Sequence, residues 1–163
     1  MDQQQLFVKM ALLSWNTQVK RAEKVFNSYT DDEFYLPVAT GKNRIVYLYG
    51  HLAAYHDMLK ETLGIGKQNR PDLAVIFLQN PDNPSIKLPP IEELKAHWTE
   101  VHGELNTLFD QLSPGDWFKR HNAMTDEDFE KDPSRNRLSV LLNRANHVAY
   151  HIGQVVLVKT VNV

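Results

Sequence analysis

Residues 91–112, with the sequence IEELKAHWTEVHGELNTLFDQL, carry an apolar side chain at every third or fourth position. The apolar positions are Ile91, Leu94, Trp98, Val101, Leu105, Leu108 and Leu112. Because these intervals alternate between three and four, the pattern places all of these side chains on one face of an α-helix. Pro89 and Pro90 before the stretch, and Ser113 to Gly115 after it, mark where the helix begins and ends.

Three further segments show the same helical period, at residues 3–28, 44–63 and 137–159. In the first of them the apolar stripe consists of Val8, Leu12, Trp15, Val19, Ala22 and Phe26. The connections 66–90 and 113–136 hold most of the prolines and polar turn residues, with short helical turns expected at 30–35 and 73–78. We therefore predict an all-α protein, a four-helix bundle with long crossover connections, in a single domain over residues 1–163.

The charge and the composition argue against several classes of protein. The formal net charge is -2 and the basic residues are scattered, so we predict no surface for nucleic acid. The least charged stretch, 138–158, contains Arg144, several amides and two histidines, and is too polar to span a membrane. The N-terminus lacks the basic start and the apolar run of a signal peptide, and we expect a cytoplasmic protein.

The chain contains no cysteine. This excludes structural disulfides, cysteine-based zinc sites and a protein thiol nucleophile. Any thiol chemistry would therefore require a thiol that arrives with the substrate.

The seven histidines can be sorted by their spacing on the predicted helices. His147 and His151 are four residues apart, so their directions differ by about 40° and they project together. One interpretation is a polar helix face exposed to solvent. However, Arg144 is the only charged residue between 138 and 158, although a long exposed face normally carries several charges. This favours a covered helix whose two imidazoles need a partner, and a metal ion satisfies them well.

His51 is the best candidate for a third ligand. On the helix 44–63 it shares with Tyr47, Ala54 and Met58 a face that we expect to point to the interior; the alternative is a core histidine bonded to a carbonyl or a tyrosine. The other histidines receive different assignments: His56 faces solvent together with Tyr49 and Lys60, His102 is a reserve ligand at the edge of its core stripe, and His97 and His121 lie at the surface or in loops.

Three imidazoles without a protein thiolate suit Zn(II), and Ni(II) is a further candidate. Three protein ligands leave at least one coordination position for water or substrate, which is typical of a catalytic metal site. The sequence argues against a ferritin-like di-iron site, because no histidine follows a glutamate at the Glu-x-x-His spacing. We assign no catalytic residue and name no general base, since Glu100 and Glu104 lie off the core stripe and are expected at the surface.

Two segments carry a resemblance to a known family. Residues 147–154, HVAYHIGQ, resemble the H-x-x-x-H-x-G-Q signature of the DinB-like (DinB/YfiT) superfamily, and residues 50–55, GHLAAY, resemble its first-ligand segment. The resemblance implies a four-helix bundle, often a homodimer, in which His51, His147 and His151 hold a divalent metal. Relatives include thiol-dependent S-transferases and isomerases that use bacillithiol, mycothiol or glutathione, and proteins described as metal-dependent hydrolases without a known substrate. The family's name does not imply DNA binding.

We therefore predict a metal-dependent enzyme for a small-molecule substrate, with thiol-dependent S-transfer ahead of hydrolysis. The alternative is a noncatalytic helical module with a structural or vestigial metal site. Candidate pocket residues share the ligand-bearing faces, with plain bundle packing as the other interpretation: Tyr47, Tyr55, Met58, Asn143 and Gln154. Gly153 is expected to permit the close approach of a helix, and Gln154 to make a polar contact at the site or at a dimer interface.

Overall fold

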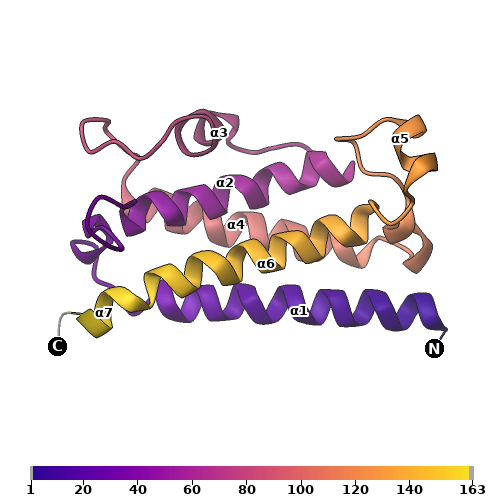
Figure 1. Cartoon of the computed structure of the whole chain (residues 1–163), viewed down its shortest axis with the longest axis horizontal. Helices are drawn as coiled ribbons and strands as arrows, with labels where there is room; N and C mark the ends of the chain where they lie inside the picture. Colours follow the sequence, from indigo (N-terminus) through magenta and orange to yellow (C-terminus); the bar gives the residue numbers. More distant parts are fainter. Residues whose placement is uncertain (1, 162–163) are drawn as a thin grey trace.

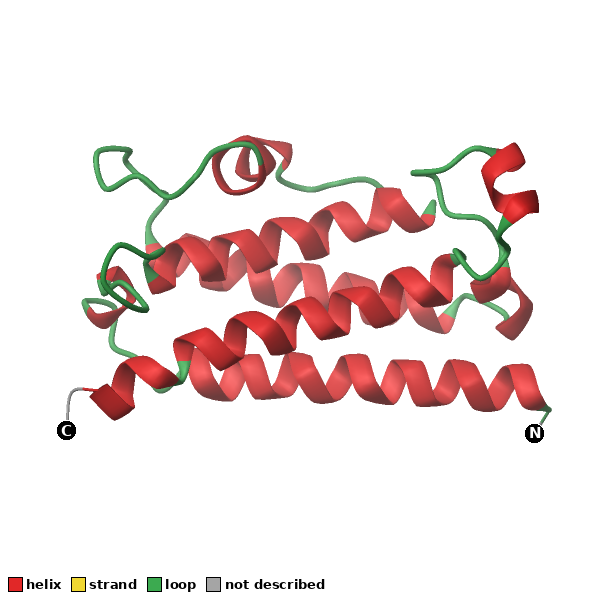
Figure 2. Ribbon diagram, viewed as in Figure 1, coloured by secondary structure: helices red, strands yellow, loops and turns green. Residues whose placement is uncertain are grey.

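Four long helices lie side by side along the length of the molecule (Figures 1 and 2). They are α1 (Gln3–Phe26), α2 (Ile45–Leu63), α4 (Ile91–Asp110) and α6 (Arg137–Val155). The structure is a computed structural model and describes residues 2–161. Within that range there is no strand, and β-type pairing is limited to two isolated bridges. The all-α prediction is therefore confirmed.

Local signals account for the helix ends. The Asp2 side chain accepts a hydrogen bond from the backbone N–H of Gln5 and caps α1, and that of Asn136 accepts one from Ser139 and caps α6. Gly64 ends α2 with a φ of 68°, a left-handed conformation that favours glycine. The helix predicted over 137–159 is interrupted at Val156, beyond which α7 (Leu157–Val161) begins.

Shorter helices occupy the connections. The expected turns at 30–35 and 73–78 are the 3-10 helix η1 (Glu33–Tyr35) and α3 (Pro71–Leu78). The sequence did not predict η2 (Pro114–Phe118) or α5 (Asp126–Lys131), which lie in the polar connection after α4. The Thr125 hydroxyl caps α5 by accepting a hydrogen bond from the backbone N–H of Asp128. At the start of η2 the Asp116 carboxylate accepts hydrogen bonds from the backbone N–H and the hydroxyl of Ser113. The connection is therefore more ordered than its polar composition suggests.

The connection that carries α3 sets the directions of the helices (Figure 1). It runs back along the bundle, so α2 and α4 point the same way, opposite to α1 and α6. The second long connection, from α4 to α6, stays at one end of the molecule. Of the two expected crossovers, the one after α2 spans the bundle, and it places α3 directly against α2.

One face of α2 differs from its prediction. Tyr49, His56 and Lys60, which we expected to face solvent, are 5%, 0% and 2% exposed. The reason is that α2 is packed against α3, α4 and α6, so little of its circumference remains free. The His56 ring lies 4.7 Å from that of Trp15, and its Nδ1 lies 3.0 Å from Nε2 of His102. The reserve ligand His102 therefore belongs to the core.

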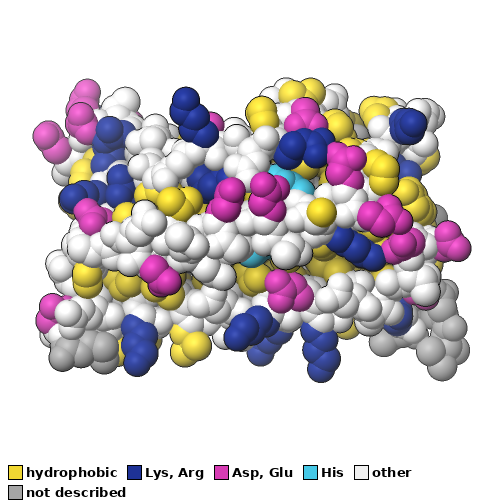
Figure 3. Space-filling model, turned by 180° about the vertical axis from the view of Figure 1, so that it is seen from behind, with side chains coloured by type: hydrophobic (Ala, Val, Ile, Leu, Met, Phe, Trp, Pro, Cys, Tyr) yellow, Lys and Arg dark blue, Asp and Glu magenta, His cyan; other side chains and the backbone are white. Residues whose placement is uncertain are grey.

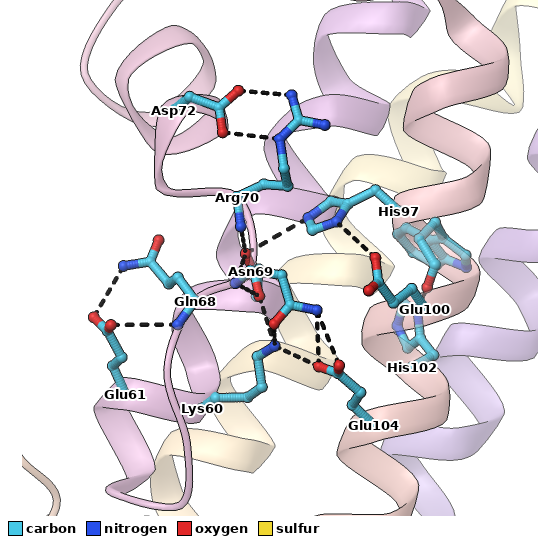
Figure 4. Close-up of polar contacts among 12 residues, drawn as sticks. Lys60, Glu61, Gln68, Asn69, Arg70, Asp72, His97, Glu100, His102 and Glu104 are labelled. Carbon is cyan, nitrogen blue, oxygen red and sulfur yellow. Dashed lines mark hydrogen bonds and ion pairs between the residues drawn. The ribbon is translucent and has the colours of Figure 1, made fainter.

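A buried ion network satisfies Lys60 (Figure 4). Its Nζ lies 2.8 Å from a carboxylate oxygen of Asp57 and 2.6 Å from one of Glu104, and it donates to the side chain of Asn69 at 2.7 Å. His97, predicted at the surface, is also buried, with its Nε2 3.6 Å from Asp57. Buried charges need such partners, and the α3–α4 side of α2 supplies them.

The surface seen from behind in Figure 3 carries acidic and basic side chains mixed together, with neither sign gathered in one large area. Among residues 2–161, no helix combines the length and the apolar character that crossing a membrane requires.

Candidate metal centre

The side chains of His51, His147 and His151 meet between α2 and α6. Nε2 of His147 lies 3.2 Å from Nε2 of His51 and 3.0 Å from Nε2 of His151. One ligand atom from each of the three residues falls within 4.8 Å of the others. The fold thus brings together the three histidines that sequence spacing and the resemblance had selected.

Helix α3 orients the first of these imidazoles. Nδ1 of His51 donates a hydrogen bond of 2.8 Å to the carbonyl oxygen of Phe77, at the end of α3. The proton is therefore on Nδ1, and Nε2 presents its lone pair. A Cβ atom on Gly50 would lie 2.4 Å from the Phe77 ring, so only glycine allows α3 to come this close. Gly50 and His51 therefore act together: the glycine lets α3 pack close to α2, and the Phe77 carbonyl of α3 orients the histidine.

Gln154 orients the third imidazole. Its side-chain oxygen accepts a hydrogen bond of 2.8 Å from Nδ1 of His151, one turn earlier on α6. Of the two roles expected for Gln154, the polar contact at the site is the one present in this chain. The expected role of Gly153 is not found here, because a Cβ atom there would meet nothing within 4 Å.

His147 lies between the other two imidazoles. Its Nδ1 is buried and has no hydrogen-bond partner in the described structure. The ring of Tyr55 stands 5.0 Å from the His147 ring and 4.8 Å from the His51 ring. The guanidinium carbon of Arg144 lies 4.4 Å from the centre of the same tyrosine ring. Tyr55 therefore contacts Arg144 as well as two of the histidines.

Burial keeps all three imidazoles neutral near pH 7. Loss of solvent contact is the largest cause of the lowered pKa of each, and it brings the pKa of His147 to about 3 with smaller contributions from His151, His51 and Arg144. A neutral imidazole is the form that binds a metal.

The donor set fits a divalent metal. Two of the facing Nε2 atoms carry lone pairs and no proton, so they cannot all satisfy one another by hydrogen bonds. Zn–N distances of about 2.0–2.1 Å in a tetrahedral site place ligand nitrogens roughly 3.3 Å apart, close to the two separations of 3.2 and 3.0 Å from Nε2 of His147. A cation at the centre would satisfy three lone pairs at once. No aspartate or glutamate belongs to this cluster among the residues that the structure describes.

The remaining pocket candidates lie at different distances from the centre. Tyr47 is buried, and its hydroxyl donates to backbone oxygens of Phe77 at 3.2 Å and Asn80 at 2.6 Å. Met58 is half-buried on α2, one turn beyond Tyr55. Asn143 lines a neighbouring cavity of about 430 Å³, and none of the three histidines lines that cavity. Tyr55 and Gln154 thus contact the histidines directly, and the ring of Tyr47 stacks on that of His51 with the ring centres 6.1 Å apart.

The cavity also contains a histidine that was assigned to a surface or loop. His121 lies in the connection after η2, as expected of a loop residue, but only 9% of it is exposed. Arg120 donates to the backbone oxygens of His121 and Met124 and so holds this connection in place. Sequence periodicity could not find this residue, because it lies outside every long helix.

Comparison with known proteins gives one positive finding. None of the curated proteins matches the chain. The family model of the DinB superfamily matches residues 15–155, which include all three histidines and both helices that carry them. The match covers most of the sequence and agrees with the all-helical fold, and the chain belongs to the DinB superfamily.

Proposed function

We propose that this protein is a metal-dependent enzyme that binds Zn(II) or Ni(II) through Nε2 of His51, His147 and His151. The observation that carries the proposal is the convergence of these three atoms, together with the anchoring of two of the imidazoles through Nδ1. Such anchoring of the second ring nitrogen is typical of histidines that bind metals. Three ligands leave a coordination position for a small molecule.

The reaction that we favour is the transfer of a low-molecular-weight thiol to an electrophile. When bound, a divalent metal lowers the pKa of a coordinating thiol, so that the thiolate forms near neutral pH. The chain has no cysteine, so that thiol is a co-substrate. Hydrolysis is the second candidate. It is less favoured because no carboxylate stands in the described histidine cluster to accept a proton from water.

In this proposal the protein's own residues would orient the metal ligands and would not themselves take part in the reaction. Phe77 and Gln154 hold two ligand rings in the tautomer that presents Nε2, and Tyr55 packs against the third. His51 and His147 are only partly buried, which supports access from solvent on one side of the centre. These features favour a site built to bind and orient a small molecule.

We also propose a homodimer. Leu6, Phe7, Met10 and Leu13 of α1 are 43–66% exposed, although they are large apolar side chains on a regular helix. Contiguous exposed apolar surface of this kind is typical of a protein–protein contact. The molar mass in solution tests this: Leu13→Glu should yield monomer, and a wild-type monomer would contradict it.

Metal content tests the first step. Protein purified without a histidine tag should contain close to one equivalent of metal, and His147→Ala should contain almost none. His97→Asn is a matched control, because His97 is a buried histidine outside the cluster and its loss should leave the metal content unchanged. Equal metal in wild type and His147→Ala would contradict the site.

Turnover tests the second step. Glutathione, bacillithiol and mycothiol should each be presented with a generic electrophile, and chromogenic esters and amides should be assayed in parallel. Thiol consumption that requires His147 supports S-transfer. Ester or amide cleavage without thiol turnover would replace it with hydrolysis, and metal binding without either activity would support the noncatalytic module.

A further inference from the structure

The cavity beside the metal centre has an electropositive lining. It has a volume of about 430 Å³, within the range of small-molecule sites. It lies between the end of α2, the connection that holds His121 and the first half of α6. Its lining consists of Thr62, His121, Ala123, Arg135, Ser139, Val140, Asn143 and Arg144. The lining includes two arginines and no carboxylate.

Neither arginine is paired with a carboxylate among residues 2–161. Arg44, Arg70 and Arg120 each pair with a carboxylate at 2.6 Å. By contrast, no described carboxylate lies within ion-pair distance of Arg135 or Arg144. Buried charges are normally paired, so the partly buried guanidinium of Arg144, with the exposed Arg135 at the same cavity, points to an anion as its partner.

The side chain of Arg144 lacks a polar partner as well as a described counter-ion. Its Nε is buried without a hydrogen-bond partner in the described structure, and its guanidinium rests on the face of Tyr55. Burial lowers the pKa of Arg144, with the nearby Tyr55 opposing the shift. The planar guanidinium matches the two oxygens of a carboxylate or a phosphate.

The cavity lining also contains neutral hydrogen-bond donors. Nδ1 of His121 accepts a hydrogen bond of 3.2 Å from the backbone N–H of Ala123, so the ring proton is on Nε2. No acceptor is recorded for that Nε2 among the residues that the structure describes. The exposed amide of Asn143 lies next to Arg144 on the same wall. The cavity lining thus offers hydrogen-bond donors and positive charges, and it contains no negatively charged group.

We propose that this cavity binds the oxyanion group, a carboxylate or a phosphate, of a small molecule through Arg144 and Arg135. Arg144 precedes His147 by three residues on α6, about 4.5 Å along the helix axis, and Tyr55 contacts both side chains. A molecule held by its anionic end at Arg144 can extend along α6 toward the histidines. This last point rests on the proposed metal-dependent function, whereas the anion site itself does not.

Calorimetric titration with inorganic phosphate and, separately, with acetate tests the site at low ionic strength. Wild type should bind one of the two saturably, and the stronger of the two identifies the source of the oxyanion. Arg144→Gln should weaken binding at least tenfold. Arg144→Lys should be intermediate, because lysine keeps the positive charge but lacks the planar guanidinium that donates two parallel hydrogen bonds. Arg135→Gln, at an exposed position that does not endanger folding, should also weaken it at least threefold. Arg21→Gln, an exposed arginine on α1, is the matched control and should bind as wild type does.

His147→Ala separates the two proposals, because it removes a metal ligand and leaves the cavity intact. It should bind the anion within about twofold of wild type. The anion site would be overturned if wild type bound neither anion saturably at millimolar concentration. It would also be overturned if Arg144→Gln and Arg135→Gln bound the anion as tightly as wild type does. Loss of anion binding in His147→Ala would show that the anion binds at a metal instead, which also overturns it.

Discussion

Nδ1 of His51 donates a hydrogen bond of 2.8 Å to the carbonyl oxygen of Phe77, twenty-six residues further along the chain. This bond determines which nitrogen of His51 faces the other two histidines. It exists because Gly50 has no side chain, so the Phe77 ring can lie against the backbone of α2. A packing contact between two helices therefore sets the protonation pattern of the candidate metal centre.

Gly50→Ala should weaken both the fold and the metal site. The added Cβ would lie 2.4–2.7 Å from three ring atoms of Phe77, and such overpacking costs about 1–3 kcal/mol of the free energy of unfolding. A displaced Phe77 would also lose its bond to His51, so metal affinity should fall. Urea unfolding and metal titration measure the two effects. Gly153→Ala is the matched control: it meets open space within a helix and should raise stability by about 0.5–1 kcal/mol. Equal stability of the two variants would contradict the packing argument.

Gln154→Leu should lower metal affinity without unfolding the protein. Its side-chain oxygen anchors Nδ1 of His151, and the loss of such a partner typically costs 10–100-fold in affinity. Competition with a chelator of known affinity measures the change. Gln111→Leu, at an exposed glutamine just after α4, should leave affinity unchanged. If Gln154→Leu also keeps wild-type affinity, the bond to His151 has no role in metal binding.

Lys60→Met should destabilise the protein strongly. It would leave Asp57, which is 0% exposed, buried without its lysine, and breaking a buried pair in this way costs about 3–5 kcal/mol. Glu104→Gln removes the partner whose side chain is 42% exposed, so it should cost less than about 1 kcal/mol. Chemical unfolding of both variants gives the comparison. A larger loss for Glu104→Gln than for Lys60→Met would reverse the assigned roles.

The pair of His56 and His102 should make stability depend on pH. Burial lowers the pKa of His102 to about 4 and lowers that of His56 well below its ordinary value. An unfolded histidine binds its proton near pH 6.5, so the unfolded state takes up protons first as the pH falls. The free energy of unfolding should therefore decrease from pH 6.5 to 4, by about 1.4 kcal/mol per pH unit for each of these histidines.

His102→Gln isolates one of these contributions. Its unfolding free energy should vary less steeply with pH than that of wild type, by about 1.4 kcal/mol per pH unit over the same range. Both proteins should be freed of metal beforehand, so that proton competition at the metal ligands does not add to the slope. Identical slopes would show that His102 does not remain neutral in the folded protein.

The sequence of the last helix was sufficient to pair His147 with His151, because residues four apart on a helix share a face whatever surrounds them. It was also sufficient for the ends of α2 and α4, where Gly64 and Pro90 act through local backbone geometry. The same reasoning failed for His56 and Lys60. His56 is buried against Trp15 of α1 and His102 of α4, and Lys60 pairs with Glu104 of α4, so their burial depends on distant parts of the chain.

The sequence alone therefore determined the four long helical segments, the apolar stripes of α1 and α4 and the choice of three histidines. These properties follow from the helical period and from residues that are neighbours in the chain. Only the tertiary structure decided that Gly50 rather than Gly153 marks a close approach, and which nitrogen of His51 carries the proton. It also decided that Arg144 lies beside a cavity with no described carboxylate as a partner. Each of these depends on which elements meet in space, and a helical period does not contain that information.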